Sequence, residues 1–371
     1  MEPLAPHEKI YVDSEIAEDE FHGELSCDEC HGGNPNDPNW KTAHEGVVKD
    51  PSYPDPSSSC GQCHEDIAEH YASSLHISLS SFKKITEKRL GSNPALQDKL
   101  TEARAAHCGG CHSSCGQCHI SRPESVEGGL LEAHLFQKKP PMHQVCTACH
   151  GSRVEKEYFG KNAGIPPDIH KEKYFKCNKC HTAEQMHGDG NQYGNRYEVE
   201  NSPKCLDCHA EIYSEKSENA SQHNDHKDKL SCQVCHSMPY KNCYACHVGR
   251  DEQGLAYYKT TGSMLGFKIG LNPLQSDKRP EKFVTVRHVP VDPHTFKYYA
   301  DIKLANFDAL PTWKLATPHN IRRQTPQNKS CNACHGNHQL FLSKNDVKPE
   351  YVNANAKVIV PPEMVPQKVD E

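Results

Sequence analysis

Apolar and polar positions along this chain form only a few short periodic patterns. Apolar residues recur at helical spacing in residues 67–75, just before His76, and again in residues 96–103 after Asn93-Pro94, where a helix is expected to begin. Apolar side chains alternate with polar ones in KFVTVRHVPV (282–291), which predicts a strand that includes His288. The remaining pattern favours long loops.

Three architectures are excluded by what the pattern lacks. There is no run of 18 apolar residues, no sustained heptad and no glycine period, so a membrane-spanning bundle, a coiled coil and collagen do not fit. Only 35% of the 371 residues are hydrophobic and 25% are charged. A chain this polar stays disordered unless something other than protein supplies an apolar interior.

The cysteines indicate what that interior is. All 20 cysteines occur in C-x-x-C pairs, and a histidine follows every pair directly. The ten motifs are CDECH (27–31), CGQCH (60–64), CGGCH (108–112), CGQCH (115–119), CTACH (146–150), CNKCH (177–181), CLDCH (205–209), CQVCH (232–236), CYACH (243–247) and CNACH (331–335).

C-x-x-C-H is the attachment signature of c-type haem. Two thiols on one short helical turn form thioethers with one porphyrin, and the adjacent histidine meets the iron. Zinc knuckles, disulfides and thioredoxin-like pairs are the alternatives for a single C-x-x-C, but they do not require a histidine after each of ten pairs. We therefore expect ten covalent haems c with iron, and a mostly irregular, haem-cored fold with short helices and few strands.

The expected attachment residues are the motif cysteines, and the expected proximal iron ligands are the motif histidines. The cysteines are Cys27, Cys30, Cys60, Cys63, Cys108, Cys111, Cys115, Cys118, Cys146, Cys149, Cys177, Cys180, Cys205, Cys208, Cys232, Cys235, Cys243, Cys246, Cys331 and Cys334. The proximal histidines are His31, His64, His112, His119, His150, His181, His209, His236, His247 and His335.

Each haem iron has a second axial position, and its ligand sets the reactivity. The chain has 26 histidines but only six methionines, so the supply favours histidine on both sides and low reduction potentials. His223 and His226 share a face of a predicted helix and can serve two neighbouring haems. The expected distal ligands are His22, His44, His76, His134, His170, His187, His223, His226, His288 and His319.

The motif spacing suggests the organisation of the chain. We expect an N-terminal arm (1–26), a nine-haem body (27–250), a haem-free wrap or small lobe that supplies distal ligands (251–330), the tenth haem (331–344) and an extended, Pro-rich tail (345–371). Two motif pairs, at Cys108 and Cys115 and at Cys232 and Cys243, are so close in sequence that their porphyrins should nearly touch.

Charge and compartment limit the partners. The formal net charge is −7, and haem propionates would make it more negative, which disfavours nucleic acid and suits cationic or metal-bearing acceptors. Thioether attachment takes place outside the cytoplasmic membrane. We expect a secreted, mature protein in the periplasm or outside the cell, without a membrane span.

With these motifs, the chain resembles prokaryotic multihaem cytochromes c. The stretches 108–136, 146–190 and 317–337 resemble octahaem-type respiratory cytochromes. That resemblance implies distal roles for His134, His170, His187 and His319. Tetrathionate-reductase-like members carry a lysine-ended motif that this chain lacks, which argues against their catalytic activity here and leaves electron transfer intact.

The chain also resembles extracellular cytochromes that polymerise into conductive filaments. This resemblance implies a homo-oligomer in which one subunit lends a histidine to its neighbour, with His7 and His22 on the arm as candidates. A discrete particle is the alternative.

The expected function is electron conduction in anaerobic or extracellular respiration, to a redox protein or an extracellular acceptor, and we expect a conduit more than an enzyme. The alternative is a respiratory reductase of nitrogen or sulfur oxyanions with one open-coordinate haem.

Overall fold

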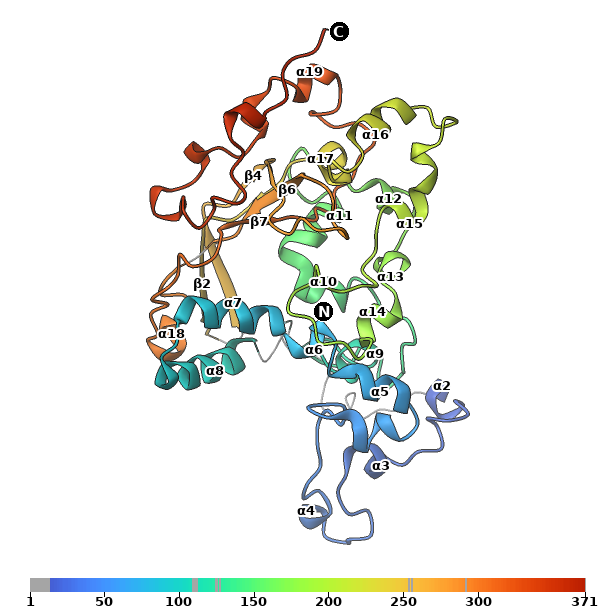
Figure 1. Ribbon diagram of the computed structural model, residues 1–371. Helices are drawn as coiled ribbons and strands as arrows, with labels where there is room; N and C mark the ends of the chain where they lie inside the picture. The colour runs from blue at the N-terminus through green and yellow to red at the C-terminus, as the bar shows by residue number, and fades with distance from the viewer. Residues whose placement is uncertain are drawn as a thin grey trace.

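A computed structural model describes residues 14–108, 113–123, 126, 128–252, 254, 256–290 and 292–370. Most of this part is irregular, with short helices and few strands, which confirms the predicted fold class. The molecule is elongated: α3 (Cys27–His31) and α4 (Trp40–Ala43) lie toward one end and α19 (Cys331–Cys334) lies at the other (Figure 1). Helices this short are marginal in isolation, so tertiary contacts or cross-links have to hold them.

The helices between these ends cluster around the motifs. The other α-helices are α2 (Ser14–Ala17), α5 (Glu65–Tyr71), α6 (Leu75–Ser78), α7 (Ser80–Leu90), α8 (Pro94–Cys108), α9 (Cys115–His119), α10 (Cys146–His150), α11 (Lys156–Tyr158), α12 (Ile169–Glu172), α13 (Cys177–Cys180), α14 (Ala183–His187), α15 (Leu206–His209), α16 (Ala220–His226), α17 (Cys232–His236) and α18 (Lys297–Ala300). The helix expected after Asn93-Pro94 is α8. The stretch expected before His76 is split into α5 and α6 by a turn.

The strands form three small antiparallel sheets. They are β1 (Tyr240–Asn242), β2 (Ala245–Arg250), β3 (Ala256–Thr261), β4 (Met264–Gly266), β5 (Ile269–Leu271), β6 (Phe283–His288) and β7 (Trp313–Leu315). β1 pairs with β4, β2 pairs with β3, and β6 lies between β5 and β7. β6 is the strand that the alternating pattern predicted, and five of its six residues are buried.

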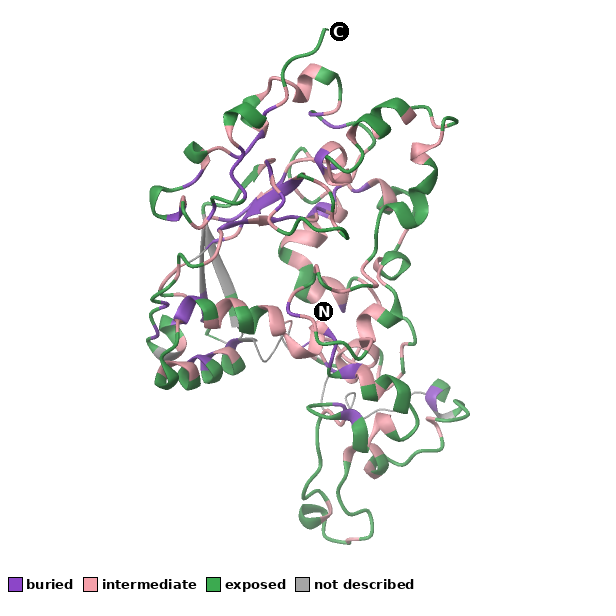
Figure 2. Ribbon diagram, in the orientation of Figure 1, coloured by how far each residue is buried: buried purple, intermediate pink, exposed green. Residues whose placement is uncertain are grey.

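The largest apolar core surrounds the β5-β6-β7 sheet and draws on the C-terminal tail. Val286 and Trp313 pack with Val358 in one cluster, and Ile269 packs with Val360 in another. The expectation of a simply extended tail was therefore wrong: it forms 3-10 turns at Pro349–Tyr351 and Pro362–Met364 and buries apolar side chains. Figure 2 shows many buried residues on this sheet, whereas most residues around α3 and α4 are exposed.

A second apolar cluster joins segments that are far apart in sequence. Leu100 of α8 packs with Val248 of β2 and with Phe296, which precedes α18. The segment 251–330 thus contributes strands, a helix and core residues. In the part of the chain that the structure describes, no helix is long and apolar enough to cross a membrane.

Candidate haem-binding sites

The described motifs share a local conformation in which both cysteines lie on one turn. α3, α9, α10, α13, α15, α17 and α19 each cover all or most of a motif, and the motif at 60–64 begins with a 3-10 turn (Cys60–Gln62). Serines that precede three of the helices stabilise them: Ser26 forms a capping box, and Ser114 and Ser330 accept a backbone hydrogen bond. Residues three apart on a helix face the same side, so two thiols can reach one ring.

Two motifs differ from the others. CYACH (243–247) runs into strand β2 and leads with Cys243, whose side chain is buried. Residues 109–112 of CGGCH lie outside the described residues, as does the side chain of His247. The predicted roles of Cys108, Cys111, His112, Cys246 and His247 therefore remain predictions.

Eight motif histidines each face a second histidine at nearly the same distance. The ring centroids are 6.1–6.3 Å apart in all eight pairs. The pairs, motif histidine first, are His31 with His134, His64 with His22, His119 with His187, His150 with His76, His181 with His319, His209 with His170, His236 with His223, and His335 with His226.

This spacing matches two imidazoles on opposite sides of one metal ion. A ligating imidazole nitrogen lies about 2 Å from its metal, and roughly 1 Å more separates it from its ring centre, so two opposed rings should be about 6 Å apart. Rings stacked directly face to face lie closer, as His22 and Phe136 do at 4.2 Å. The residues present therefore fit an iron held between two histidines.

Hydrogen bonds at Nδ1 orient several of these rings. In His31, His119, His223, His226, His236 and His335, Nδ1 donates to a backbone carbonyl oxygen over 2.7–3.1 Å. A protonated Nδ1 leaves the lone pair on Nε2, which is the tautomer that a metal-bound imidazole needs. His223 and His226 lie on α16 as predicted, and they face two different motif histidines.

Burial keeps some of the rings neutral. Burial, with the neighbouring His150 and His181, lowers the pKa of His76 to about 4. Burial also lowers the pKa of His319 to about 4, and His181 adds to the effect. A neutral imidazole is the form that binds a metal, so both side chains are poised as ligands near neutral pH.

Two predicted distal histidines have no motif histidine opposite them among the described side chains. His44 is exposed at the end of α4, and its Nδ1 donates to the carbonyl of Trp40 over 2.6 Å. His288 is buried, stacks on Tyr244 with ring centroids 4.5 Å apart and donates to the carbonyl of Cys243. His288 thus packs against the motif 243–247, and its predicted role as a distal ligand stays a prediction, because the side chains of His112 and His247 lie outside the described part.

The suggestion that the arm lends a histidine to another subunit is corrected for one residue. His22 faces His64 of the same chain, with ring centroids 6.3 Å apart, so its ring lies opposite a motif histidine of its own subunit. His7, the other candidate, lies outside the described residues.

Thiol contacts connect neighbouring motifs. Cys60 shares a hydrogen bond with Cys115, which lowers the pKa of Cys60 to about 6. Cys146 with Cys177 and Cys232 with Cys205 form two further pairs, in which the pKa of Cys146 and that of Cys232 fall to about 7. In each pair the first cysteines of two motifs lie close to each other, so the two predicted attachment points are adjacent.

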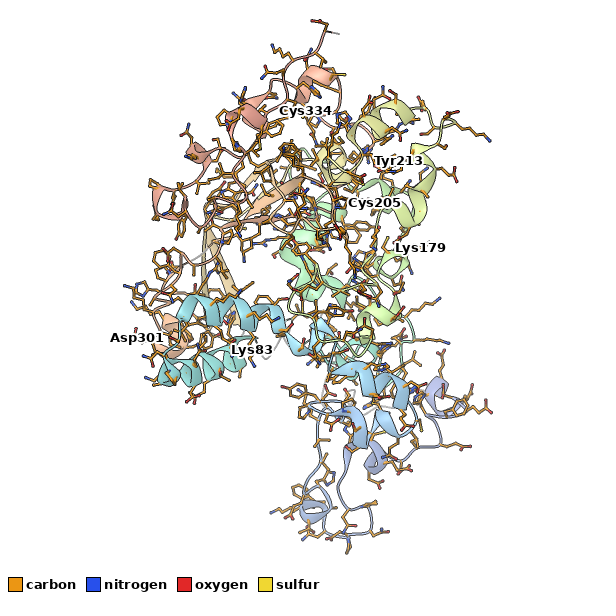
Figure 3. The ribbon with its side chains drawn as sticks, in the orientation of Figure 1. Lys83, Lys179, Cys205, Tyr213, Asp301 and Cys334 are labelled. Atoms are coloured by element: carbon orange, nitrogen blue, oxygen red, sulfur yellow. The ribbon has the colours of Figure 1, made fainter. Side chains whose placement is uncertain are left out.

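Four further pairs of thiols act on each other electrostatically, and with them the motifs form a single row. After burial, the main cause in each case, a neighbouring thiol also raises the pKa: Cys60 acts on Cys30, Cys146 on Cys118, Cys208 on Cys180 and Cys334 on Cys235. The motifs then follow in the order 27–31, 60–64, 115–119, 146–150, 177–181, 205–209, 232–236 and 331–335. The labels of the motif helices α3, α9, α10, α13, α15, α17 and α19 lie progressively higher in Figure 1, and Figure 3 marks Cys205 and Cys334 in its upper part.

One continuous cavity follows this row. Its volume is about 5660 Å³, well above the roughly 300–1,000 Å³ of a pocket for one small molecule. Cysteines of all eight motifs and all sixteen paired histidines line it. Arg153, Arg196 and Lys314 also line it, and burial near Arg89 and Arg196 lowers the pKa of Lys314 to about 8. Such cations suit ligands that carry carboxylates, as haem does.

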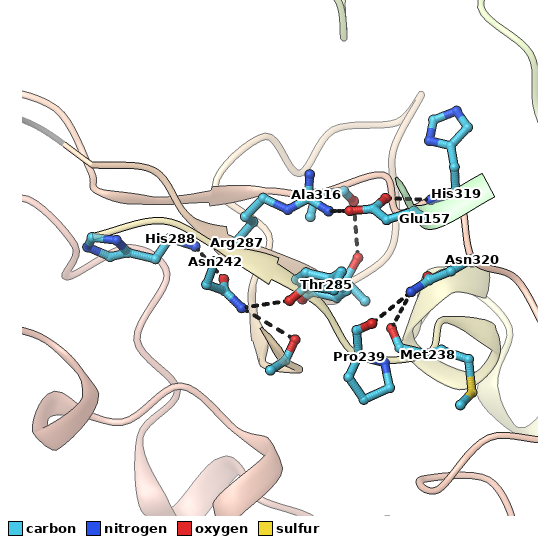
Figure 4. A network of polar contacts seen from close by, with 12 residues as sticks. Glu157, Met238, Pro239, Asn242, Thr285, Arg287, His288, Ala316, His319 and Asn320 are labelled. Atoms are coloured by element: carbon cyan, nitrogen blue, oxygen red, sulfur yellow. Dashed lines mark hydrogen bonds and ion pairs between the residues drawn. The ribbon is translucent and has the colours of Figure 1, made fainter. Parts of the chain in front are cut away.

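A buried ion pair supports one of the distal ligands. The Glu157 carboxylate, fully buried, binds the Arg287 guanidinium of β6 and accepts a hydrogen bond from the backbone N–H of His319 over 2.9 Å. Figure 4 shows Glu157 between these two partners and Asn320 bonded to the carbonyls of Met238 and Pro239. The loop that carries His319 is thus held from both sides.

Asp168 links the distal candidate His170 to the loop that carries His319. One oxygen accepts hydrogen bonds from the backbone N–H and from Nδ1 of His170, each 2.8 Å long, and the other accepts from the N–H of Ile321 over 2.8 Å. The bond to Asp168 raises the pKa of His170. Sequence reasoning missed Asp168 and Glu157, although an aspartate directly before a short helix is a capping signal that could have indicated Asp168.

Comparisons with known proteins yield one similarity. No family model matches the sequence, and no curated protein matches it. Among solved structures, the chain is similar to an octahaem cytochrome c from Shewanella oneidensis, with 15% identity and a TM-score of 0.43, over 80% of this chain and 94% of that chain.

Proposed function

We propose that this protein is a multihaem electron-transfer protein with ten covalently bound c-type haems. The observation that carries the proposal is the set of eight histidine pairs with ring centroids 6.1–6.3 Å apart, each with one member from a C-x-x-C-H motif. Eight repeats of one spacing, each beside a pair of thiols, are difficult to explain by packing alone. The two remaining motifs carry the same residue types and extend the count to ten.

Each residue type has one task in this proposal. The motif cysteines hold the porphyrin edge through thioethers, and the two histidines hold the iron from opposite sides. When bound, each haem supplies an iron that gains and loses one electron, and two histidine ligands favour low potentials. The polypeptide binds and orients the groups, and the basic side chains of the cavity offer partners for propionates.

The row of motifs supports a role as a conduit. Thiols of adjacent motifs lie close to each other, so haems attached there would be near neighbours along the molecule. Cys27 at one end and Cys331 at the other are exposed. We therefore place the entry and exit of electrons at the motifs 27–31 and 331–335.

The physiological role is proposed on the same basis. Covalent haem attachment implies a periplasmic or extracellular location, and exposed ends suit a redox protein or an extracellular acceptor in anaerobic respiration. End-to-end association of subunits, up to a filament, would join the two exposed ends into a longer conductor. The exposed Phe21 and Trp40 near the first motif offer apolar surface for such a contact. Electron microscopy at high protein concentration tests the filament: only discrete particles would contradict it.

Haem content and spin state test the proposed function. The full chain, produced in cells that attach c-type haem, should carry ten haems per polypeptide by mass spectrometry. Electron paramagnetic resonance of the oxidised protein should show low-spin, six-coordinate iron. A full-occupancy high-spin haem that turns over nitrite, hydroxylamine or tetrathionate would favour the reductase instead.

A further inference from the structure

One distal ligand in the row is bonded to a buried negative charge. The Asp168 side chain is 3% exposed, and its Oδ1 accepts the Nδ1 hydrogen of His170 over 2.8 Å. His170 faces His209 of the motif 205–209, with ring centroids 6.1 Å apart. Asp168 is therefore the immediate neighbour of the ligand, on the side away from the metal position.

Other paired histidines with a defined Nδ1 contact have different acceptors. Six donate to backbone carbonyls, and His181 bonds to the side-chain oxygen of Gln185 over 2.9 Å. Only His22 also meets a carboxylate, that of Asp19 over 3.2 Å, and that carboxylate is 46% exposed. Among these contacts His170 alone combines a short bond with a buried carboxylate.

Nearby cations do not cancel this charge directly. Arg322 lies on the adjacent loop, but its guanidinium is paired with Glu172 at 2.7 Å. The other oxygen of Asp168 is bonded to the uncharged backbone N–H of Ile321. The Nδ1 hydrogen of His170 thus remains the polar side-chain hydrogen that faces the carboxylate.

The physical consequence concerns the iron that His170 would hold. A carboxylate bonded to Nδ1 raises the basicity of the imidazole and orients it, and a stronger donor stabilises the ferric state more than the ferrous state. Charge effects are larger at a buried position, where water screens them less. On the proposed function, we propose that Asp168 makes the haem of motif 205–209 the site of lowest reduction potential in the row.

The position of this site gives the low potential a consequence. It is sixth of the eight motifs in the row, so five motifs precede it and two follow it, the last of them at the end 331–335. An electron that crosses the molecule therefore has to pass through this site of lowest potential, which separates the motifs before it from the motifs after it. Asp168 then divides the row into two groups of haems that are reduced separately.

The first experiment is a redox titration of the full holoprotein and its D168N variant. Asparagine keeps the size and removes the charge. The lowest midpoint potential should shift upward while the other haems keep theirs, and every haem should remain low-spin. Unchanged potentials, or conversion of one haem to high spin, would show that Asp168 has only a structural role and would overturn the proposal.

A ligand exchange identifies the haem and isolates the hydrogen bond. H170M should remove the lowest step from the titration, because methionine as second ligand raises the potential. When D168N is added to H170M, the further change in midpoint potential should be much less than half of the change that D168N causes in the unaltered protein, since no Nδ1 hydrogen remains. A different step moving in H170M, or an undiminished second shift, would contradict the proposal. H170M also decides the question if D168N does not accumulate.

D19N is the matched control. It removes the exposed carboxylate from His22, where water screens the charge, so its shift should be smaller than that of D168N. An equal or larger shift would refute the role of burial. Haem content and spin state are measured first on the unaltered protein: a failure there refutes the proposed function, whereas ten low-spin haems with no effect of D168N refute this inference alone.

Discussion

The buried pair of Glu157 and Arg287 offers a direct test of how the row is supported. The Glu157 side chain is 1% exposed and the Arg287 side chain 11%, so both charges are removed from water. In E157Q the amide oxygen can still accept the N–H of His319, but the guanidinium loses its counter-charge. Breaking a buried pair from one side typically costs about 3–5 kcal/mol, because an uncompensated charge stays buried.

The assay is guanidinium unfolding of the holoprotein followed by far-UV circular dichroism. With a slope of about 4 kcal/mol per molar guanidinium, a loss of about 4 kcal/mol lowers the midpoint by about 1 M. The double variant E157M/R287M should recover most of the loss, because it leaves no lone charge in the interior. A midpoint change in E157Q equivalent to less than about 1 kcal/mol, or a double variant as unstable as the single one, would refute this reasoning.

Three further predictions concern the row and its surroundings. Replacing Cys146 and Cys149 by alanine should lower the haem count, measured by mass spectrometry, by one. It should also slow electron transfer between the ends, measured by stopped-flow reduction, far more than the same change at the terminal motif 331–335. Equal slowing by the two changes would contradict the proposed row. Y240F should cost about 1–2 kcal/mol in chemical unfolding, since the buried hydroxyl donates to the Val286 carbonyl over 2.6 Å; an unchanged midpoint would show that bond to be dispensable. G188A should destabilise the protein by about 1–2 kcal/mol, because Gly188 has φ +92° and an added Cβ would lie 2.6 Å from the carbonyl oxygen of His70. The change should also displace the neighbouring His187 and yield a high-spin signal. A purely low-spin spectrum would contradict this prediction.

Much of the candidate site was predictable because its chemistry is local. Two cysteines and a histidine within five residues form one helical turn, and no distant segment is needed to define it. The supply of histidines also favoured histidine as second ligand, and eight of the ten residues named for that role lie opposite a motif histidine. For His44 and His288 the role stays a prediction, since a histidine on a short helix or strand has the same local pattern whether or not it lies opposite a motif histidine.

What the sequence by itself determined is the number and spacing of the C-x-x-C-H motifs and the loop-rich, helix-poor character of the chain, because both follow from composition and short-range spacing. The tertiary structure alone decided which histidine faces which motif and in what order the motifs meet. His181 faces His319, and Cys235 lies within electrostatic range of Cys334, across long stretches of chain. It also decided the burial of Glu157 and Asp168, because burial of a carboxylate depends on what folds over it and on the partners that offset its desolvation.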